Sequence, residues 1–280
     1  MIIKNVIFYP APHAEHHKKA MALLANGFKT HGIHYQTRKP LEPGQLATAC
    51  DLAVIWGHGK RHQVLIDQMR ARSKPYLVIE MAYVGNRTSM YSLGFNGLNG
   101  RAVFPTINDN GRRWNTLFPN YLKPWQVKLG SYGLIMGQCR GDAAIKHVDF
   151  QHWLYQRAAE IIKAGFLPRY RPHPKAPNTW NDPAPRIYGT LHGALEVASI
   201  VVTYNSNSAV DALLMGVPTV AMDQGSMAWS IADKKVSAKP NQPSREAWAH
   251  QLAWCQWLPS ELENGTAWSV LSNVLQEQAA

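Results

Sequence analysis

The sequence has few cysteines and no long apolar run. Its three cysteines, Cys50, Cys139 and Cys255, are far apart and form no C-x-x-C pair, so we expect neither a disulfide framework nor a thiolate zinc site. A reducing, cytoplasmic compartment fits this usage. The first residues lack the basic and apolar regions of a signal peptide, and no stretch reaches the roughly 18 apolar residues of a membrane span. The sequence therefore predicts a protein that is neither exported nor membrane-spanning.

Acidic residues are also scarce. Lys and Arg number 29 against 18 Asp and Glu, which gives a formal net charge of +11. This excess predicts attraction to a polyanion, which can be nucleic acid, an anionic membrane surface or an acidic polysaccharide. We expect the N-terminal half to meet it, because that half is rich in basic residues. They include Lys18, Lys19, Lys60, Arg61, Arg70, Arg72, Lys74, Arg87, Arg101, Arg112 and Arg113.

What is present is a globular composition and an alternation of strands and helices. The chain has 280 residues, of which 46% are hydrophobic, and this length predicts two lobes at roughly 100 to 200 residues per domain. Apolar runs over 2–9, 51–56 and 75–81 alternate with helical patterns over 14–30 and 62–72. A second series of strands and helices begins near residue 133. Such alternation predicts parallel sheets covered by helices on both faces.

Two regions fall outside this rhythm. Residues 82–125 are rich in Gly, Asn, Arg and aromatics, and we expect a long ordered loop there. The tail over 245–278 reads as two helices. Its tryptophans, Trp248, Trp254, Trp257 and Trp268, have helical spacing and are expected to pack the tail onto a lobe.

The most informative segment runs from Leu191 to Asp223. A buried strand, IVVTY, delivers Asn205, Ser206, Asn207 and Ser208 to the carboxyl end of a parallel sheet, where such sheets bind ligands. The hydroxyls and the start of the next helix suit a diphosphate. Asp211 can accept hydrogen bonds from sugar hydroxyls, or it can be a carboxylate favoured by the helix dipole.

Two further motifs point the same way: LIMGQCRGD over Leu134–Asp142 and RPHP over Arg171–Pro174. Together with the segment above, which is similar to the pattern N-S-x-x-x-(D/E)-A-L-x-x-G-x-P, they resemble the donor half of GT-B glycosyltransferases. Within these, the likeness is to the capsular-polysaccharide and Kdo-transferase-like group, over roughly residues 130–275. The resemblance implies an α/β GT-B fold, with two Rossmann-like parallel-sheet lobes facing a central cleft. Residues 1–125 would form the acceptor lobe, and residues 126–280 the donor lobe with C-terminal helices.

The resemblance also implies a donor site for a nucleotide sugar, either a UDP-sugar or a CMP-sugar, with no firm metal requirement. Gly137 permits close approach of the backbone to phosphate, and Gln138 offers an amide. Arg171 and His173 can neutralise the leaving phosphate. His173 can equally be a buried structural histidine, and Asp142 can simply fix its loop. The donor residues expected are Gly137, Gln138, Asp142, Arg171, His173, Asn205, Ser206, Asn207, Ser208 and Asp211.

The N-terminal lobe is expected to hold the acceptor. Glu80, at the end of the strand PYLVIEM, is a candidate base that deprotonates the acceptor hydroxyl, or a structural carboxylate paired with Arg87. His13 and His58 are alternative candidates for this role. The cluster of Glu15, His16 and His17 beside His13 lacks HExxH spacing, which favours a solvated helix start over a metal site.

The segment from Glu80 to Phe104 combines basic and aromatic side chains, among them Tyr83, Arg87 and Arg101. Such a mixture can track phosphates and stack on bases, clasp sugars, or pack the lobes. The basic N-terminal lobe, which looks like phage-type relatives of the group, makes a hydroxymethylated pyrimidine in bacteriophage DNA the first acceptor considered, in the host cytoplasm. The alternatives are a capsular or lipid-linked glycan acceptor, and a non-catalytic nucleic-acid-binding protein with the same fold.

Overall fold

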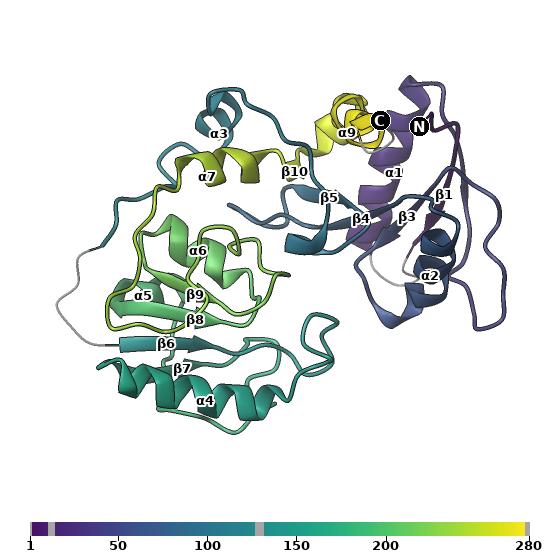
Figure 1. Cartoon of the computed structure of the whole chain (residues 1–280). Helices are drawn as coiled ribbons and strands as arrows, with labels where there is room; N and C mark the ends of the chain where they lie inside the picture. The colour runs from purple at the N-terminus through teal and green to yellow at the C-terminus, as the bar shows by residue number, and fades with distance from the viewer. Residues whose placement is uncertain (1, 11–14, 127–131, 278–280) are drawn as a thin grey trace. The chain divides into compact units, whose positions relative to one another are not determined.

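In the computed structural model, residues 2–10, 15–126 and 132–277 are described. The chain divides into two compact units (Figure 1). Unit 1 comprises Met1–Arg113 together with Gln251–Ala280, and unit 2 comprises Trp114–His250. Each unit is built on its own β-sheet.

The sheet of unit 1 has the strand order β10-β5-β4-β3-β1-β2. The four strands at one side, β2, β1, β3 and β4, are parallel, as the alternation predicts. The remaining two, β5 and β10, are antiparallel. The bounds are β1 Asn5–Tyr9, β2 His34–Thr37, β3 Leu52–Trp56, β4 Tyr76–Met81, β5 Tyr91–Phe95 and β10 Gln256–Trp257.

Helices cover both faces of this sheet, because its central strands are apolar on both sides. On one face, α1 (Glu15–Thr30) and α9 (Thr266–Glu277) pack with Phe8, Phe28 and Trp268 in one core. On the other face, α2 (Gln63–Ala71) packs Leu65 and neighbouring apolar side chains against the strands. The shorter helices are η1 Lys60–His62, η2 Asn99–Arg101, α3 Arg112–Leu117 and α8 Pro259–Glu263.

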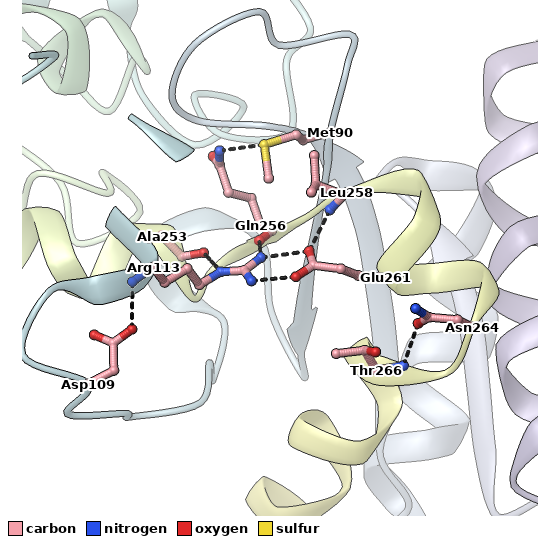
Figure 2. Close-up of polar contacts among 9 residues, drawn as sticks. All are labelled: Met90, Asp109, Arg113, Ala253, Gln256, Leu258, Glu261, Asn264 and Thr266. Atoms are coloured by element: carbon pink, nitrogen blue, oxygen red, sulfur yellow. Dashed lines mark hydrogen bonds and ion pairs between the residues drawn. The ribbon is translucent and has the colours of Figure 1, made fainter. Parts of the chain in front are cut away.

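From Gln251 onward the tail belongs to unit 1, whereas the sequence led us to expect the whole tail in the second lobe, after a boundary at residue 125. Its strand β10 extends the unit 1 sheet beside β5. An ion pair anchors it, in which the Arg113 guanidinium donates two hydrogen bonds to the Glu261 carboxylate at 2.5 and 2.7 Å (Figure 2). The same guanidinium lies 4.8 Å from the ring centroids of both Trp254 and Trp257. The tail tryptophans therefore pack, as expected. Trp254, Trp257 and Trp268 pack in the core of unit 1, whereas Trp248 donates from Nε1 to the Met227 carbonyl in unit 2.

Unit 2 has a wholly parallel sheet with the order β7-β6-β8-β9. One face is covered by α4, and the other by α5 and α6 (Figure 1). The strands are β6 Tyr132–Met136, β7 Leu167–Arg171, β8 Ala198–Thr203 and β9 Thr219–Ala221. The helices are α4 Phe150–Lys163, α5 Leu191–Val197, α6 Ser208–Leu214 and α7 Glu246–Ala253, which crosses from unit 2 into unit 1.

The expected long loop over 82–125 contains regular structure. It holds β5, η2 and α3, and β5 is fully buried between β4 and β10. The sequence YSLGF lacks a clear alternation of polar and apolar residues, and no helical pattern flanks it. It forms a strand because of its pairing with β4 and β10 rather than because of its own composition. The same holds for β2, whose HYQT sequence is polar because it lies at the edge of the sheet.

Candidate functional site

The candidate site in unit 2 is the edge of its sheet at which all four strands end. Because the strands are parallel, the turns that follow them leave at one edge, where open α/β sheets bind ligands. The donor residues expected from the sequence lie at or just beyond these strand ends, except Ser208 and Asp211, which lie in α6. We call this region the strand-end site, defined by residues 137–142, 171–173, 204–208 and 222–226.

Buried side-chain hydrogen bonds tie three of these turns together. Gln138 donates from Nε2 to Asn205 Oδ1 at 2.9 Å and accepts from the Asn205 backbone N–H at 3.3 Å. Asn205 Nδ2 donates to Asp223 Oδ1 at 2.8 Å, and that carboxylate also accepts from the Gly225 N–H at 2.9 Å. The three side chains are 5 to 8% exposed. The Gln138 and Asn205 amides are thus bonded to other groups of unit 2, and their expected contact with the donor stays a prediction.

Sequence reasoning missed Asp223, although a signal was present. It follows the strand TVAM directly, and a carboxylate at the carboxyl end of a buried parallel strand is placed at the ligand edge. Its partner Asn205 is 18 residues away in the chain. The bond between them joins the turns after β8 and β9 and fixes the edge of the sheet.

Gly137 is required by its neighbours in unit 2. A Cβ at this position would lie 2.6 Å from the Tyr170 hydroxyl and 3.1 Å from Pro172 Cα. The Gly137 N–H also donates to the Arg171 carbonyl at 2.8 Å. The glycine therefore lets the exits of β6 and β7 approach each other, a reason for its presence that differs from the phosphate contact expected.

His173 is held in a defined orientation at the exit of β7. Its Nδ1 accepts a hydrogen bond from the Lys175 backbone N–H at 3.2 Å, and the Cys139 thiol lies 3.0 Å from the same nitrogen. A ring nitrogen that accepts carries no proton, so the neutral ring has its proton on Nε2. Burial, followed by the nearby Asp142, raises the pKa of the Cys139 thiol, so the thiol stays protonated and donates. The N–H of the neutral His173 ring therefore lies on Nε2.

Asp142 closes the loop that carries Cys139. Its Oδ2 accepts a hydrogen bond from the Cys139 backbone N–H at 3.2 Å, and its residue is exposed. The loop-fixing function was one of the two interpretations considered for Asp142. On the inner side of the loop, Trp180 Nε1 donates to the Gln138 carbonyl at 2.6 Å, and the Arg140 guanidinium stacks on the Trp180 ring at 4.7 Å.

Arg171 supplies positive charge to the strand-end site. It is the last residue of β7, half-buried, and donates one hydrogen bond to the Gly189 carbonyl at 2.9 Å. Burial lowers the pKa of its guanidinium, yet an arginine stays charged at neutral pH. No carboxylate of the described residues forms an ion pair with it. A partly buried cation without a carboxylate partner is suited to an anionic ligand.

The turn after β8 brings hydroxyl groups together, as expected. Ser208 Oγ donates to Ser206 Oγ at 2.9 Å, and the Ser208 N–H lies 3.3 Å from the same oxygen. Asn207 begins α6 without a side-chain capping bond. The helix has only seven residues, so its dipole contributes less here than the sequence interpretation assumed. Asp211 lies half-buried in its first turn.

In unit 1, Glu80 lies near the end of β4 and is half-buried. It is paired in register with Ser92 of β5, and it lines a narrow crevice with Tyr83 and Ser92. A Cβ on Gly57 would lie 2.9 Å from Glu80 Oε1. Gly57 also has a φ of +64°, so both its backbone conformation and the closeness of Glu80 favour glycine. The role of Glu80 as a base stays a prediction.

The candidate acceptor residues of unit 1 differ in exposure. Tyr83 is 3% exposed, and burial raises the pKa of its phenol strongly, so it belongs to the interior rather than to an open binding surface. His58 is half-buried with Nε2 at 3.3 Å from the Tyr76 hydroxyl. Arg87 and Arg101 are exposed, and Arg87 donates from Nε to the Ala82 carbonyl at 2.9 Å. His13 lies outside the described residues.

The histidines at the start of α1 pack on an aromatic ring. The His17 ring stacks on Trp56 with centroids 3.8 Å apart, and the His16 ring meets Trp56 edge-on at 5.3 Å. Burial, then His16 and Arg61, lower the pKa of His17 to about 4, so its ring is neutral at pH 7. Within the described ranges, no three His, Cys, Asp or Glu residues gather as metal ligands. Over the same ranges, no helix has both the length and the apolar character needed to cross a bilayer.

No protein-family model and no curated protein matches the sequence. Solved structures do match. The β-Kdo 2,4-transferase of Thermosulfurimonas dismutans KpsC is 14% identical with a TM-score of 0.60, over 98% of this chain and 99% of that one. The β-Kdo 2,7-transferase of the same protein is 12% identical with a TM-score of 0.56, over 91% and 92%. The chain therefore has a GT-B fold, similar to that of these Kdo transferases, which confirms the predicted fold class and resemblance.

Proposed function

We propose that the protein is a glycosyltransferase that takes a sugar from a nucleotide-sugar donor and transfers it to a hydroxyl of a glycan. The observation that carries this proposal is the strand-end site of unit 2. There, Arg171 and His173 leave β7 while Ser206 and Ser208 follow β8. Those strands are separated by one strand, β6, a span of about 10 Å at the usual strand spacing. A nucleotide's phosphate groups fit across such a span.

The proposed chemistry follows from where charge develops. As the bond between the sugar and the donor phosphate breaks, negative charge grows on the departing phosphate oxygens. Donors that are already oriented stabilise that charge most effectively. Arg171 supplies a fixed positive charge and His173 an Nε2–H donor, while the buried bonds of Gln138 and Asn205 hold the turns in place. The hydroxyls of Ser206 and Ser208, with Asn207 and Asp211, are the proposed contacts to phosphate and sugar hydroxyls.

The acceptor hydroxyl oxygen attacks the anomeric carbon and must lose its proton to a base. Glu80 is the proposed base, and His13 is the alternative. This step forms the new glycosidic bond, releases the nucleotide and moves one proton to the base.

A glycan is the proposed acceptor because the two similar structures are Kdo transferases. The expectation of a hydroxymethylated pyrimidine in DNA rests on the net charge of +11, and the comparisons add nothing to support it. We therefore propose the alternative acceptor that the sequence analysis named, a capsular or lipid-linked glycan.

The experiment incubates the full chain with CMP-sugars and UDP-sugars, with and without oligosaccharide acceptors, and measures nucleotide release and labelled product. Nucleotide release that depends on an oligosaccharide supports the proposal. Hydroxymethylated DNA serves as a parallel acceptor, and labelling of DNA alone would overturn the glycan assignment. Binding of donors without any release or transfer would point to a non-catalytic sugar-nucleotide-binding protein.

A further inference from the structure

A basic groove lies in unit 2 between α4 and the segment over residues 234–238. It encloses about 410 Å³ and is lined by side chains of α4, by Met222 and by that segment. Four cations line it, Arg157, Lys163, Lys234 and Lys235, against one carboxylate, Glu160. Its volume falls in the range of small-molecule sites.

The groove shares Met222 with the strand-end site, and its other lining residues lie outside that site. Helix α4 connects the parallel strands β6 and β7, so it runs back from the strand-end edge toward the edge where the strands begin. Arg157, Glu160 and Lys163 occupy its middle and last turns. The groove therefore lies on the face of the sheet that α4 covers, and it is also lined by Met222, the residue after β9.

Arg157 is the central cation of the groove and is incompletely bonded. Its side chain is 13% exposed, and NH2 forms an ion pair with Glu160 Oε1 at 2.7 Å. NH1 points at the thioether sulfur of Met222 at 3.3 Å, which is a weak acceptor. Within the described residues Nε has no hydrogen-bond partner. NH2 also donates to Gln156 Oε1 at 3.3 Å. A nearly buried guanidinium with an unpaired Nε is costly, and an anion in the groove would offer the guanidinium a stronger acceptor than the Met222 sulfur.

Lys234 has a different function, because it builds the wall of the groove. Its ammonium group donates to the Ala232 carbonyl at 2.6 Å and to the Trp229 carbonyl, and it lies 4.0 Å from the Trp229 ring centroid. Burial lowers its pKa. These contacts fix the start of the segment over 234–238. Lys163 and Lys235 are exposed residues, as Lys234 is, and they form the rim of the groove.

We propose that this groove binds an acidic sugar, that is, a sugar acid or a sugar phosphate. The planar Arg157 guanidinium suits a carboxylate or phosphate. Lys163 and Lys235 add two positive charges at the rim, whereas Glu160 supplies a single negative charge. The apolar surfaces of Met222, Val236 and Ala164 line the same groove and suit the C–H face of a sugar ring. This proposal does not depend on the proposed transfer reaction.

The test is isothermal titration of the full chain with glucuronate, glucose 6-phosphate, glucose and inorganic phosphate. We expect saturable binding of glucuronate or glucose 6-phosphate. The double substitution Lys163→Glu and Lys235→Glu should weaken it by at least about tenfold, since two attractive charges become repulsive. Lys123→Glu, an exposed lysine of the same unit outside the groove, is the matched control and should bind as the wild type does.

Arg157→Lys keeps the charge and removes the planar fork, so it should weaken binding of both ligand classes. The wild-type affinities separate the classes: tighter binding of glucuronate than of glucose 6-phosphate assigns a sugar acid, and the reverse assigns a sugar phosphate. Binding must also persist in Arg171→Ala, which alters the strand-end site alone.

Four results would overturn the proposal. They are no saturable binding of either acidic sugar, equal binding of glucose, binding of inorganic phosphate as tight as that of the sugars, and unchanged affinity in the double variant. Loss of binding in Arg171→Ala would show that the sugar binds at the strand-end site, and it would also overturn the proposal. None of these results bears on whether a nucleotide sugar is consumed, so the two proposals fail separately.

Discussion

At the strand-end site of unit 2, buried hydrogen bonds from Gln138, Asn205 and Asp223 join turns of the same sheet. In unit 1 the comparable buried amide is that of Gln256, in the tail of the chain. Its Oε1 accepts hydrogen bonds from the Tyr83 and Val84 backbone N–H groups at 2.8 and 3.0 Å. Unit 2 therefore orders its edge with residues of its own βα turns. Unit 1 completes its sheet with a strand from about 170 residues further along the chain.

This difference has a functional meaning under the proposed reaction. A donor site needs pre-oriented charges, and unit 2 provides them on a rigid parallel sheet. Unit 1 offers a half-buried carboxylate, Glu80, in a strand flanked by an antiparallel neighbour. Substitutions in the two units should therefore have different effects. Those in unit 1 should lower the transfer rate, and those in unit 2 should also weaken donor binding.

Glu80→Gln should have the largest effect. It keeps the shape of a half-buried side chain and removes its basicity, so transfer should fall by about 10² to 10⁴ while donor affinity is unchanged. Steady-state transfer rates and donor titration measure the two quantities. Glu263→Gln, an exposed carboxylate of the same unit, is the control. Near-normal transfer in Glu80→Gln would remove Glu80 as the base and point to His13.

Arg171→Ala and His173→Ala test the unit 2 side of the comparison. Each should lower the transfer rate by about 10² if the side chain stabilises the departing phosphate. Donor binding should weaken in Arg171→Ala, in contrast to Glu80→Gln. His192→Ala, an exposed histidine on α5, is the matched control. Full activity in both variants would take these residues out of the donor site.

Arg113→Ala tests the attachment of the tail to unit 1. Arg113 and Glu261 are 10% and 15% exposed, so removing one partner leaves a largely buried charge, at a cost of about 3 to 5 kcal/mol. Urea denaturation should show this loss in the free energy of unfolding. Arg38→Ala removes only an exposed bond to Gln36 and should change it little. Equal free energies of unfolding in the two variants would show that the Arg113–Glu261 ion pair does not hold the tail on unit 1.

Asn205→Ala and Gln256→Ala compare the two buried amides directly. Each leaves buried partners unbonded, at a cost of about 1 to 3 kcal/mol for the unsatisfied groups. We expect only Asn205→Ala to weaken donor binding as well, because only that amide orders the strand-end site. Thermal unfolding combined with donor titration separates the two effects, and equal donor affinities in both variants would break the comparison.

Acidification should destabilise unit 1 through two histidines. Burial is the first cause that lowers the pKa of His17 and of His62 to about 4, below the ordinary value of 6.5. The unfolded chain then binds more protons than the folded chain between pH 6.5 and 4, so stability is fully present above pH 6.5 and falls as the pH drops through this window. Melting temperatures of the wild type and His62→Gln across the window measure the effect. An identical pH dependence of the melting temperature in both proteins would show that His62 does not cause the loss of stability.

The sequence predicted the parallel parts of the fold well because their signals are local. A buried strand followed by a polar turn places residues such as His173 and Ser206 at the strand-end edge without any knowledge of distant partners. The strand expected over 51–56 is β3, Leu52–Trp56, and the helix expected over 62–72 is α2, Gln63–Ala71, so both agree with the structure to within one residue.

The parts that could not be predicted depend on contacts between distant residues. β5 is a strand because it pairs with β4 and β10, and β10 because it pairs with β5. Arg113 contacts Glu261, which is 148 positions away in the chain. The direction of an amide side chain at a strand end also depends on residues that are distant in the sequence. Gln138, for example, bonds to Asn205, which is 67 residues away. Side-chain direction at the site therefore had to come from the structure.

The central claim, that the strand-end site of unit 2 holds the donor, is tested most directly by a crystal structure with a bound CMP-sugar or UDP-sugar. We expect density for the phosphate groups within hydrogen-bond distance of Arg171, His173 and the Ser206 or Ser208 hydroxyl. Density for the nucleotide at any other place in the chain, with the strand-end site containing only solvent, would contradict it.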